Sequence, residues 1–144
     1  MRDNSIALEL LALKNDNGLV NPSEVVTWAR RNHNSRLHGA LEWDDDIAGE
    51  KWRIAQVRSL IAVHVTDAEG MRGLVSLSID RTPGNNGYRG MDDVISRPDL
   101  RDVMMQDALA ELERVQAKYA RLTELQEVWE AADKVRTRKR RKAA

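Results

Sequence analysis

The 144-residue sequence predicts a mainly α-helical fold: a small helix-turn-helix-like body with one β-hairpin, followed by a long C-terminal amphipathic helix. Three features support this prediction. Helix-start signals recur through the first half, apolar and polar residues alternate within positions 61–79, and neither Gly nor Pro occurs after Pro98. We expect four segments: a body over 1–80, a loop or linker over 81–95, a long helix over 96–136 and a basic tail over 137–144.

The body begins with two predicted helices. Apolar residues share one face over Ser5–Lys14, and Gly18 is expected to turn the chain after this helix. Asn21 is expected to cap the second helix, because an Asn side chain can accept a hydrogen bond from the first turn. Pro22 follows at a position where its missing N–H has no hydrogen-bonding cost. This helix should end near residues 32–34.

Two further helices are expected before the hairpin. A short helix covers 35–41, and a longer one starts where Trp43 is followed by three Asp residues, since carboxylates stabilise the positive end of a helix. Trp28 and Trp52 lie on the apolar faces of their predicted helices. We therefore expect both of these indole rings in the core.

The predicted hairpin consists of one strand over 61–65, a turn over Asp67–Gly70 and a second strand over 74–79. The ten residues from Arg81 to Gly90 include four Gly or Pro residues, so we expect a loop there.

The last third predicts a helix of coiled-coil type. Apolar residues keep a heptad spacing from Met105 to Trp129, broken only at Gln126. A continuous helix of roughly 40 residues would be about 60 Å long, which is more than the body can cover. We expect a homodimer or a partner contact through five residues: Leu112, Tyr119, Leu122, Leu125 and Trp129.

The charge is unevenly distributed although the formal net charge is zero. Seven of the 23 Lys and Arg residues lie between Lys134 and Lys142, which leaves 16 basic and 23 acidic residues in positions 1–133. Such a basic segment attracts nucleic acid through counterion release. The nucleic-acid contacts expected from it are Arg136, Arg138, Lys139, Arg140 and Arg141. The alternative is a solubilising tail or a docking segment for an acidic partner.

The helices before the hairpin follow the order of elements in a winged helix-turn-helix domain. The DNA contacts expected from them are Arg30, Arg31, Arg36, Arg53 and Arg58, and Arg72 would lie on the wing. Several carboxylates in the same region repel phosphate, and the connection between the helices is longer than the usual tight turn. The alternative is a helical core with a solvated charged face.

We expect no enzyme, metal centre or cofactor. The chain has no Cys, so disulfides, thiolate metal sites and thiol nucleophiles are excluded. His33 and His38 precede Asp44–Asp46, but their spacing matches no metal-ligand pattern. No apolar run approaches the roughly 18 residues of a membrane span, and the N-terminus lacks a secretory-signal pattern. A cytoplasmic protein without membrane association is therefore expected.

Two blocks of the sequence resemble an uncharacterised family of small phage and prophage proteins: SRLHGALEWDDDIAGEKWRIAQVRSLI and SRPDLRDVMMQDALAELERVQAKYARLTELQEVWEA. The family pattern is a Leu-His…Glu-Trp-Asp-Asp segment, a helix with aromatic-Arg and Ala/Val-Arg pairs, and a long C-terminal helix. The matching positions are Leu37, His38, Glu42, Trp43, Asp44, Asp45, Trp52, Arg53, Val57, Arg58, Pro98, Leu100, Ala108, Leu109 and Leu112. The resemblance implies a phage or mobile-element origin and a bacterial host cytoplasm, and it implies no mechanism.

These observations favour a noncatalytic phage or prophage accessory protein that binds DNA as a homodimer, with a regulatory role as one form of that activity. The alternative is a morphogenesis or adaptor protein whose long helix and basic tail bind a phage or host protein.

Overall fold

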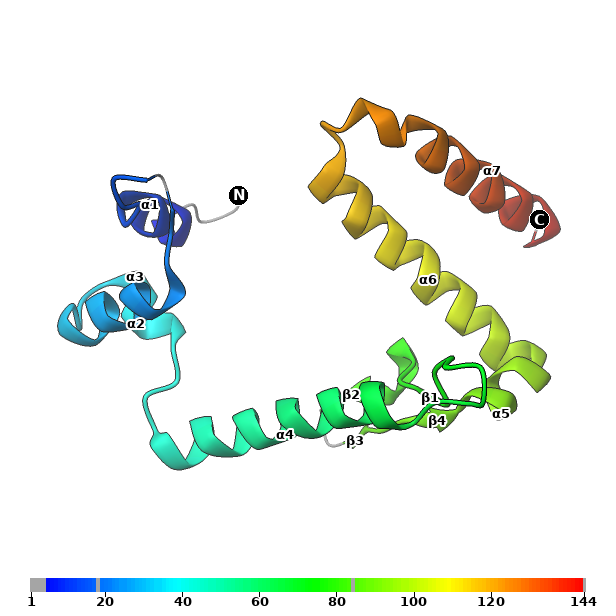
Figure 1. The fold of residues 1–144 in the computed structure, drawn as a ribbon, viewed down its shortest axis with the longest axis horizontal. Coiled ribbons are helices and arrows are strands. Elements are labelled where there is room, and N and C mark those ends of the chain that lie inside the picture. Colours follow the sequence, from blue (N-terminus) through cyan, green and yellow to red (C-terminus); the bar gives the residue numbers. More distant parts are fainter. Residues whose placement is uncertain (1–4, 18, 84, 144) are drawn as a thin grey trace. The chain divides into compact units, whose positions relative to one another are not determined.

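The computed structural model describes residues 5–17, 19–83 and 85–143, so the turn expected at Gly18 lies outside the described residues. The predicted fold class is confirmed: the described chain is mainly helical, with short antiparallel strands and long helices toward the C-terminus (Figure 1). The chain divides into two compact units, Met1–Val57 and Arg58–Ala144. The strands therefore belong with the C-terminal helices rather than with the first three helices.

The N-terminal unit contains α1 (Ser5–Ala12), α2 (Pro22–Arg31) and α3 (Arg36–Ala40). Three residues of α2 and α3 form its buried core: Val25, Ala29 and Leu37. Partly buried side chains pack around this core: Leu10, Leu13, Trp28 and Trp43. The expected core position of Trp28 is thus confirmed.

Side-chain caps define where these short helices begin. Asn21 accepts a hydrogen bond from the Ser23 N–H and caps α2, as predicted, and Ser35 accepts one from the His38 N–H at the start of α3. The Glu9 carboxylate also accepts hydrogen bonds from the first two N–H groups of α3, at 3.0 and 2.9 Å. These bonds satisfy donors that a helix N-terminus otherwise leaves without partners, and they join α1 to α3.

Helix α4 (Asp45–His64) begins as predicted, with the Asp44 carboxylate accepting hydrogen bonds from the N–H groups of Asp46 and Ile47. Two other expectations for this segment are wrong. The helix continues to His64, so no strand forms over 61–65, and Trp52 is 65% exposed rather than part of a core. No residue of α4 is buried, because its apolar side chains are spread around the helix instead of forming one stripe.

The C-terminal unit contains two short antiparallel strand pairs instead of the predicted hairpin. Strand β1 (Leu74–Val75) pairs with β4 (Arg89–Gly90), and β2 (Arg81–Thr82) pairs with β3 (Asn85–Asn86). The segment over 81–90 is therefore partly strand rather than loop. The turn expected at Asp67–Gly70 does form, with Gly70 at a positive φ of 80°, but it closes only a single bridge between Thr66 and Arg72.

The C-terminal unit has a buried core of its own. A 3-10 turn η1 (Ser78–Asp80) and helix α5 (Met91–Ser96) lead into this core. The buried residues are Leu77, Val94 and Leu100, with Val75, Val103 and Met104 packed against them.

An ion pair joins the 3-10 turn η1 to strand β4. Arg89 donates from Nε to Asp80 Oδ2 at 2.6 Å and from Nη2 to Asp80 Oδ1 at 2.8 Å. Asp80 is buried, and a bidentate pair fixes orientation as well as distance. The hydrogen bond from Arg89 lowers the pKa of Asp80 from its usual value, against the opposing effect of burial.

The long helix expected over 96–136 is interrupted, and its unbroken course is a wrong prediction. Helix α6 (Pro98–Tyr119) ends, a 3-10 turn η2 (Thr123–Leu125) reverses the chain, and α7 (Gln126–Ala143) runs back beside α6 (Figure 1). The segment expected as a basic tail thus forms the end of α7. The sequence carries the signal for this break, since Thr123 and Gln126 have the capping-box spacing of a new helix and Gln126 is where the heptad fails.

Trp129 was expected to anchor an interface and is instead buried within its own unit, at 5% exposure, together with Ala132 on α7. Its indole N–H has no hydrogen-bond acceptor among the described residues. Leu125 is half-buried. Burial of these apolar side chains stabilises the helical hairpin.

The Asp80–Arg89 pair should make the stability of the fold depend on acid. The pKa of Asp80 in the folded state lies below its unfolded value of about 3.9. Its stabilising contribution is therefore complete above that value and is lost as the pH falls through the folded-state pKa. We expect Arg89→Met to lower the free energy of unfolding at pH 7 and to flatten its decrease in acid. Urea titrations between about pH 7 and pH 2 measure this.

Arg121→Met is the matched control, because Arg121 has no partner in the described part of the chain. Equal acid dependence in Arg89→Met and the unaltered protein would contradict a role for the pair.

Burial of Trp129 predicts a large loss of stability on truncation. We expect Trp129→Ala to lower the free energy of unfolding by about 3–5 kcal/mol, and Trp52→Ala by less than about 0.5 kcal/mol because Trp52 is exposed. Trp129→Phe should cost less than Trp129→Ala, since it keeps one aromatic ring in the core and the indole N–H that it removes has no partner. Urea unfolding monitored by circular dichroism tests all three. Equal effects of the two alanine substitutions would refute the burial of Trp129.

Candidate nucleic-acid interface

The cationic residues predicted near the C-terminus lie on one helix, α7, and most of them face solvent. Five are exposed: Lys134, Arg138, Arg140, Arg141 and Lys142. None of the five forms an ion pair with a carboxylate of any described residue. Their charges are therefore available to an external anion.

Two predicted tail residues instead hold the helical hairpin together. The Arg136 side chain is 14% exposed; its Nε lies 3.3 Å from Glu113 Oε1, and its Nη2 donates to the Leu109 carbonyl at 3.2 Å. Lys139 Nζ donates to the Asp102 carbonyl at 3.2 Å. The Arg136 guanidinium is thus engaged between α6 and α7, and its contact with nucleic acid stays a prediction.

The fold-back also gathers further charge around the end of α7. A hollow of about 650 Å³ lies between the start of α6 and the end of α7, and we call it the cationic hollow. Its lining is Arg101, Asp102, Met105, Val135, Arg138, Lys139, Arg141 and Lys142. Five cations against one carboxylate produce a local positive potential, and a concave surface focuses such a field.

A row of apolar side chains remains exposed along α6 and its end. Leu112, Val115, Tyr119 and Leu122 are between 37% and 49% exposed, and we call this row the apolar stripe. It corresponds to the heptad positions of the sequence. Of the five expected interface residues, Leu112, Tyr119 and Leu122 thus stay accessible, whereas Trp129 does not.

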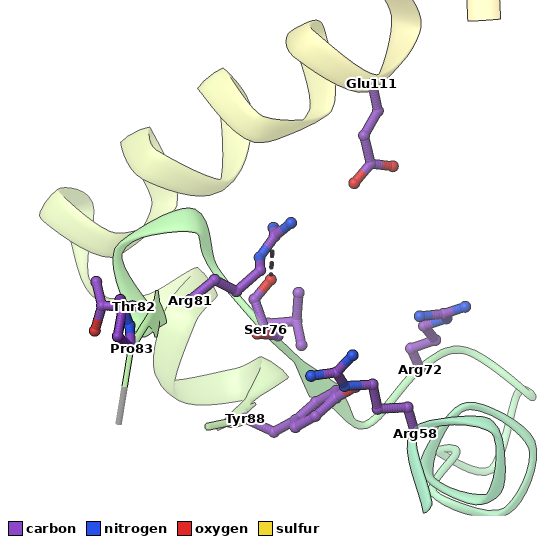
Figure 2. A pocket seen from close by; sticks show the side chains of 9 residues that line it. Arg58, Arg72, Ser76, Arg81, Thr82, Pro83, Tyr88 and Glu111 are labelled. Atoms are coloured by element: carbon purple, nitrogen blue, oxygen red, sulfur yellow. Dashed lines mark hydrogen bonds between the residues drawn. The ribbon is translucent and has the colours of Figure 1, made fainter. Parts of the chain in front are cut away.

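A second concave site lies elsewhere in the same unit, and we call it the arginine cavity (Figure 2). It has a volume of about 600 Å³. The residues that line it are Arg58, Arg72, Val75, Ser76, Arg81, Thr82, Pro83, Tyr88 and Glu111. Three arginines from three chain segments therefore line it, and two of them, Arg58 and Arg72, were predicted as contacts from the sequence.

Local structure places each of these arginines. Arg58 lies near the end of α4. Arg72 follows a turn in which the Asp67 carboxylate accepts hydrogen bonds from the N–H groups of Glu69 and Met71. Arg81 Nη2 donates to the Ser76 carbonyl at 3.0 Å and lies 3.6 Å from Asp107 Oδ2.

The arginines predicted in the N-terminal unit do not form a comparable surface. The Arg30 guanidinium lies over the Trp43 ring, 5.1 Å from its centroid, and Arg53 pairs with Glu50 at 3.8 Å. Arg31 and Arg36 are exposed. Arg30 and Arg53 thus contribute to packing and to a local ion pair.

The histidines considered as metal ligands have structural contacts. His38 Nδ1 hydrogen-bonds with the Ala29 carbonyl at 2.9 Å, and its ring stacks on Trp43 at 4.8 Å between centroids. Trp43 Nε1 donates to the His38 carbonyl at 2.8 Å. Across the described residues, no group of three or more His, Asp or Glu side chains is placed to hold a metal ion, and no described helix is long and apolar enough to cross a membrane.

Comparison with known proteins gives no family for this chain. No family model matches it, no curated protein matches it, and no solved structure matches it.

Sequence reasoning missed three residues of these surfaces: Arg81, Tyr88 and Arg101. Arg81 and Tyr88 lie near the two ends of the Gly- and Pro-rich segment. A turn in this segment would bring its two ends together, and this was the signal available in the sequence. Arg101 carries no local signal, because it joins the basic residues of α7 only through the reversal of the chain after α6.

Proposed function

We propose that this chain is a noncatalytic accessory protein that binds DNA through the basic face of α7. The observation that carries the proposal is the exposed set of α7 cations without ion-pair partners among the described residues, together with Arg101 in the cationic hollow. Phosphate contacts by such residues supply most sequence-independent affinity for nucleic acid. The resemblance to phage and prophage proteins supports an accessory role in a bacterial host.

A second copy of the chain is proposed as the occupant of the apolar stripe. Leu112, Val115 and Tyr119 follow a spacing of three and four residues along α6, which is the pattern of a helix–helix seam, and Leu122 lies just beyond the end of this helix. Such a seam is self-complementary about a twofold axis. A dimer formed in this way presents two cationic faces to one nucleic acid.

The DNA-binding proposal predicts a strong salt dependence that arises from α7. We expect a labelled generic duplex to bind at low salt and to dissociate as salt rises. Combined Arg138→Gln, Arg141→Gln and Lys142→Gln substitutions should weaken binding and reduce the slope of log affinity against log salt by about 2.7. Fluorescence anisotropy over a salt series measures both quantities.

The matched control removes the same charge from the N-terminal unit, with Arg31→Gln, Arg36→Gln and Arg53→Gln. This variant should bind as the unaltered protein does. The reverse result would assign binding to the helix-turn-helix arginines, and no binding by the unaltered chain at low salt would eliminate DNA as a ligand.

The dimer proposal predicts a change of mass when the apolar stripe is made acidic. We expect Leu112→Glu with Tyr119→Glu to sediment as a monomer, since burying carboxylates in an apolar seam is unfavourable. Leu8→Glu with Leu11→Glu on α1 is the control, because both leucines are exposed and lie outside the stripe. If the unaltered chain is itself a monomer, the stripe belongs to a different partner, as in the adaptor alternative.

A further inference from the structure

We infer that the arginine cavity is a binding site for a nucleoside phosphate. This inference goes beyond the DNA contact proposed for α7 and is independent of it, because none of the cavity residues lies on α7. The cavity volume of about 600 Å³ is within the range of small-ligand sites, which is about 300–1,000 Å³.

The donors of the cavity favour a phosphate group. The side chains of Arg58 and Arg72 have no hydrogen-bond or ion-pair partner within the described ranges of the chain. Guanidinium groups bind phosphate oxygens through charge-assisted hydrogen bonds, so two guanidinium groups without partners in the lining of one cavity favour a phosphate as the ligand. Arg81 is oriented by the Ser76 carbonyl and is ion-paired with Asp107, so it shapes the wall of the cavity, and the available positive charge comes from Arg58 and Arg72.

The remaining walls favour a ligand that carries a ring. Tyr88 is half-buried and lines the cavity, and an aromatic side chain is a sequence-tolerant stacking surface for a nucleobase. Val75 and Pro83 add apolar surface beside it. Inorganic phosphate would leave these apolar groups without contacts.

Glu111 adds a negatively charged group to the lining of the cavity. Figure 2 shows Glu111 extending from α6 toward the cavity, while Arg58 and Tyr88 come from other chain segments. A carboxylate repels phosphate but accepts hydrogen bonds from an amine or a hydroxyl. The cavity therefore suits one phosphate with an attached nucleoside better than a chain of phosphates.

A nucleoside phosphate could reach the cavity in two forms, as a free nucleotide or as one nucleotide unit of a single-stranded nucleic acid. Titration calorimetry of the full chain with adenosine 5′-monophosphate, a short single-stranded oligo-dA and inorganic phosphate distinguishes them. We expect the monophosphate or the oligonucleotide to bind more tightly than inorganic phosphate. Binding of the monophosphate indicates a free-nucleotide site, and binding of the oligonucleotide alone indicates a strand site.

Variants assign the binding to the cavity. Arg58→Gln and Arg72→Gln should each weaken the bound nucleoside phosphate about tenfold or more, the loss typical of one charge-assisted hydrogen bond. Tyr88→Leu should weaken it about fivefold or more by removing stacking, and Tyr88→Phe should retain it. Arg121→Gln removes an exposed charge outside the cavity and should have no effect.

The inference is distinguishable from the DNA-binding proposal. The α7 triple variant should bind the nucleoside phosphate normally even where duplex binding is lost. Equal affinity for inorganic phosphate and the nucleoside phosphate, unchanged affinity in Arg58→Gln and Arg72→Gln, or no binding of either nucleoside-phosphate probe would overturn the inference.

Discussion

The bidentate pair between Asp80 and Arg89 is the contact on which the C-terminal unit depends. It joins the segment that follows the buried Leu77 to the strand that precedes α5, and it buries a carboxylate that is stabilised by a matching cation. The neighbours of the two paired residues are Arg81 and Tyr88, which both line the arginine cavity. The ion pair therefore joins the two short segments that carry Arg81 and Tyr88, which are seven positions apart in the sequence. The polar site and the apolar core are thus held by the same few residues.

The two charged surfaces of this unit differ in kind. The basic face of α7 carries a row of long cationic side chains from one helix, to which Arg101 of α6 is added in the cationic hollow, and such a row suits a ligand with many evenly spaced charges. The arginine cavity is concave, with each cation supplied by a different segment and a carboxylate opposite. Such a site is selective for shape as well as charge. A single unit can hold both because α6 contributes to each, with Arg101 in the cationic hollow and Glu111 in the arginine cavity.

Local signals in the sequence were sufficient to predict most of the helices, but not to predict which segments pack against one another. Asn21, Ser35 and Asp44 cap the helices that their side chains predict, because a cap is an interaction within a few residues. The strand pairing of Leu74 with Gly90 and the reversal after Tyr119 depend on contacts between distant residues, which periodicity does not encode. The same limit explains the two wrong predictions for tryptophans: Trp52 was expected in the core and is exposed, and Trp129 was expected at an interface and is buried. Both lie on amphipathic patterns, and only the tertiary arrangement decides which pattern is covered. Of the candidate site, Arg58, Arg72 and the α7 cations were predicted, whereas Arg81, Tyr88 and Arg101 required the fold.

The return of α7 along α6 also limits the footprint of its basic face. The nine residues from Lys134 to Lys142 cover only about 13 Å of helix axis at 1.5 Å per residue. One turn of B-form DNA extends about 34 Å. A bound chain would therefore touch less than half a turn and one side of the duplex, and the remaining circumference would stay open to further copies.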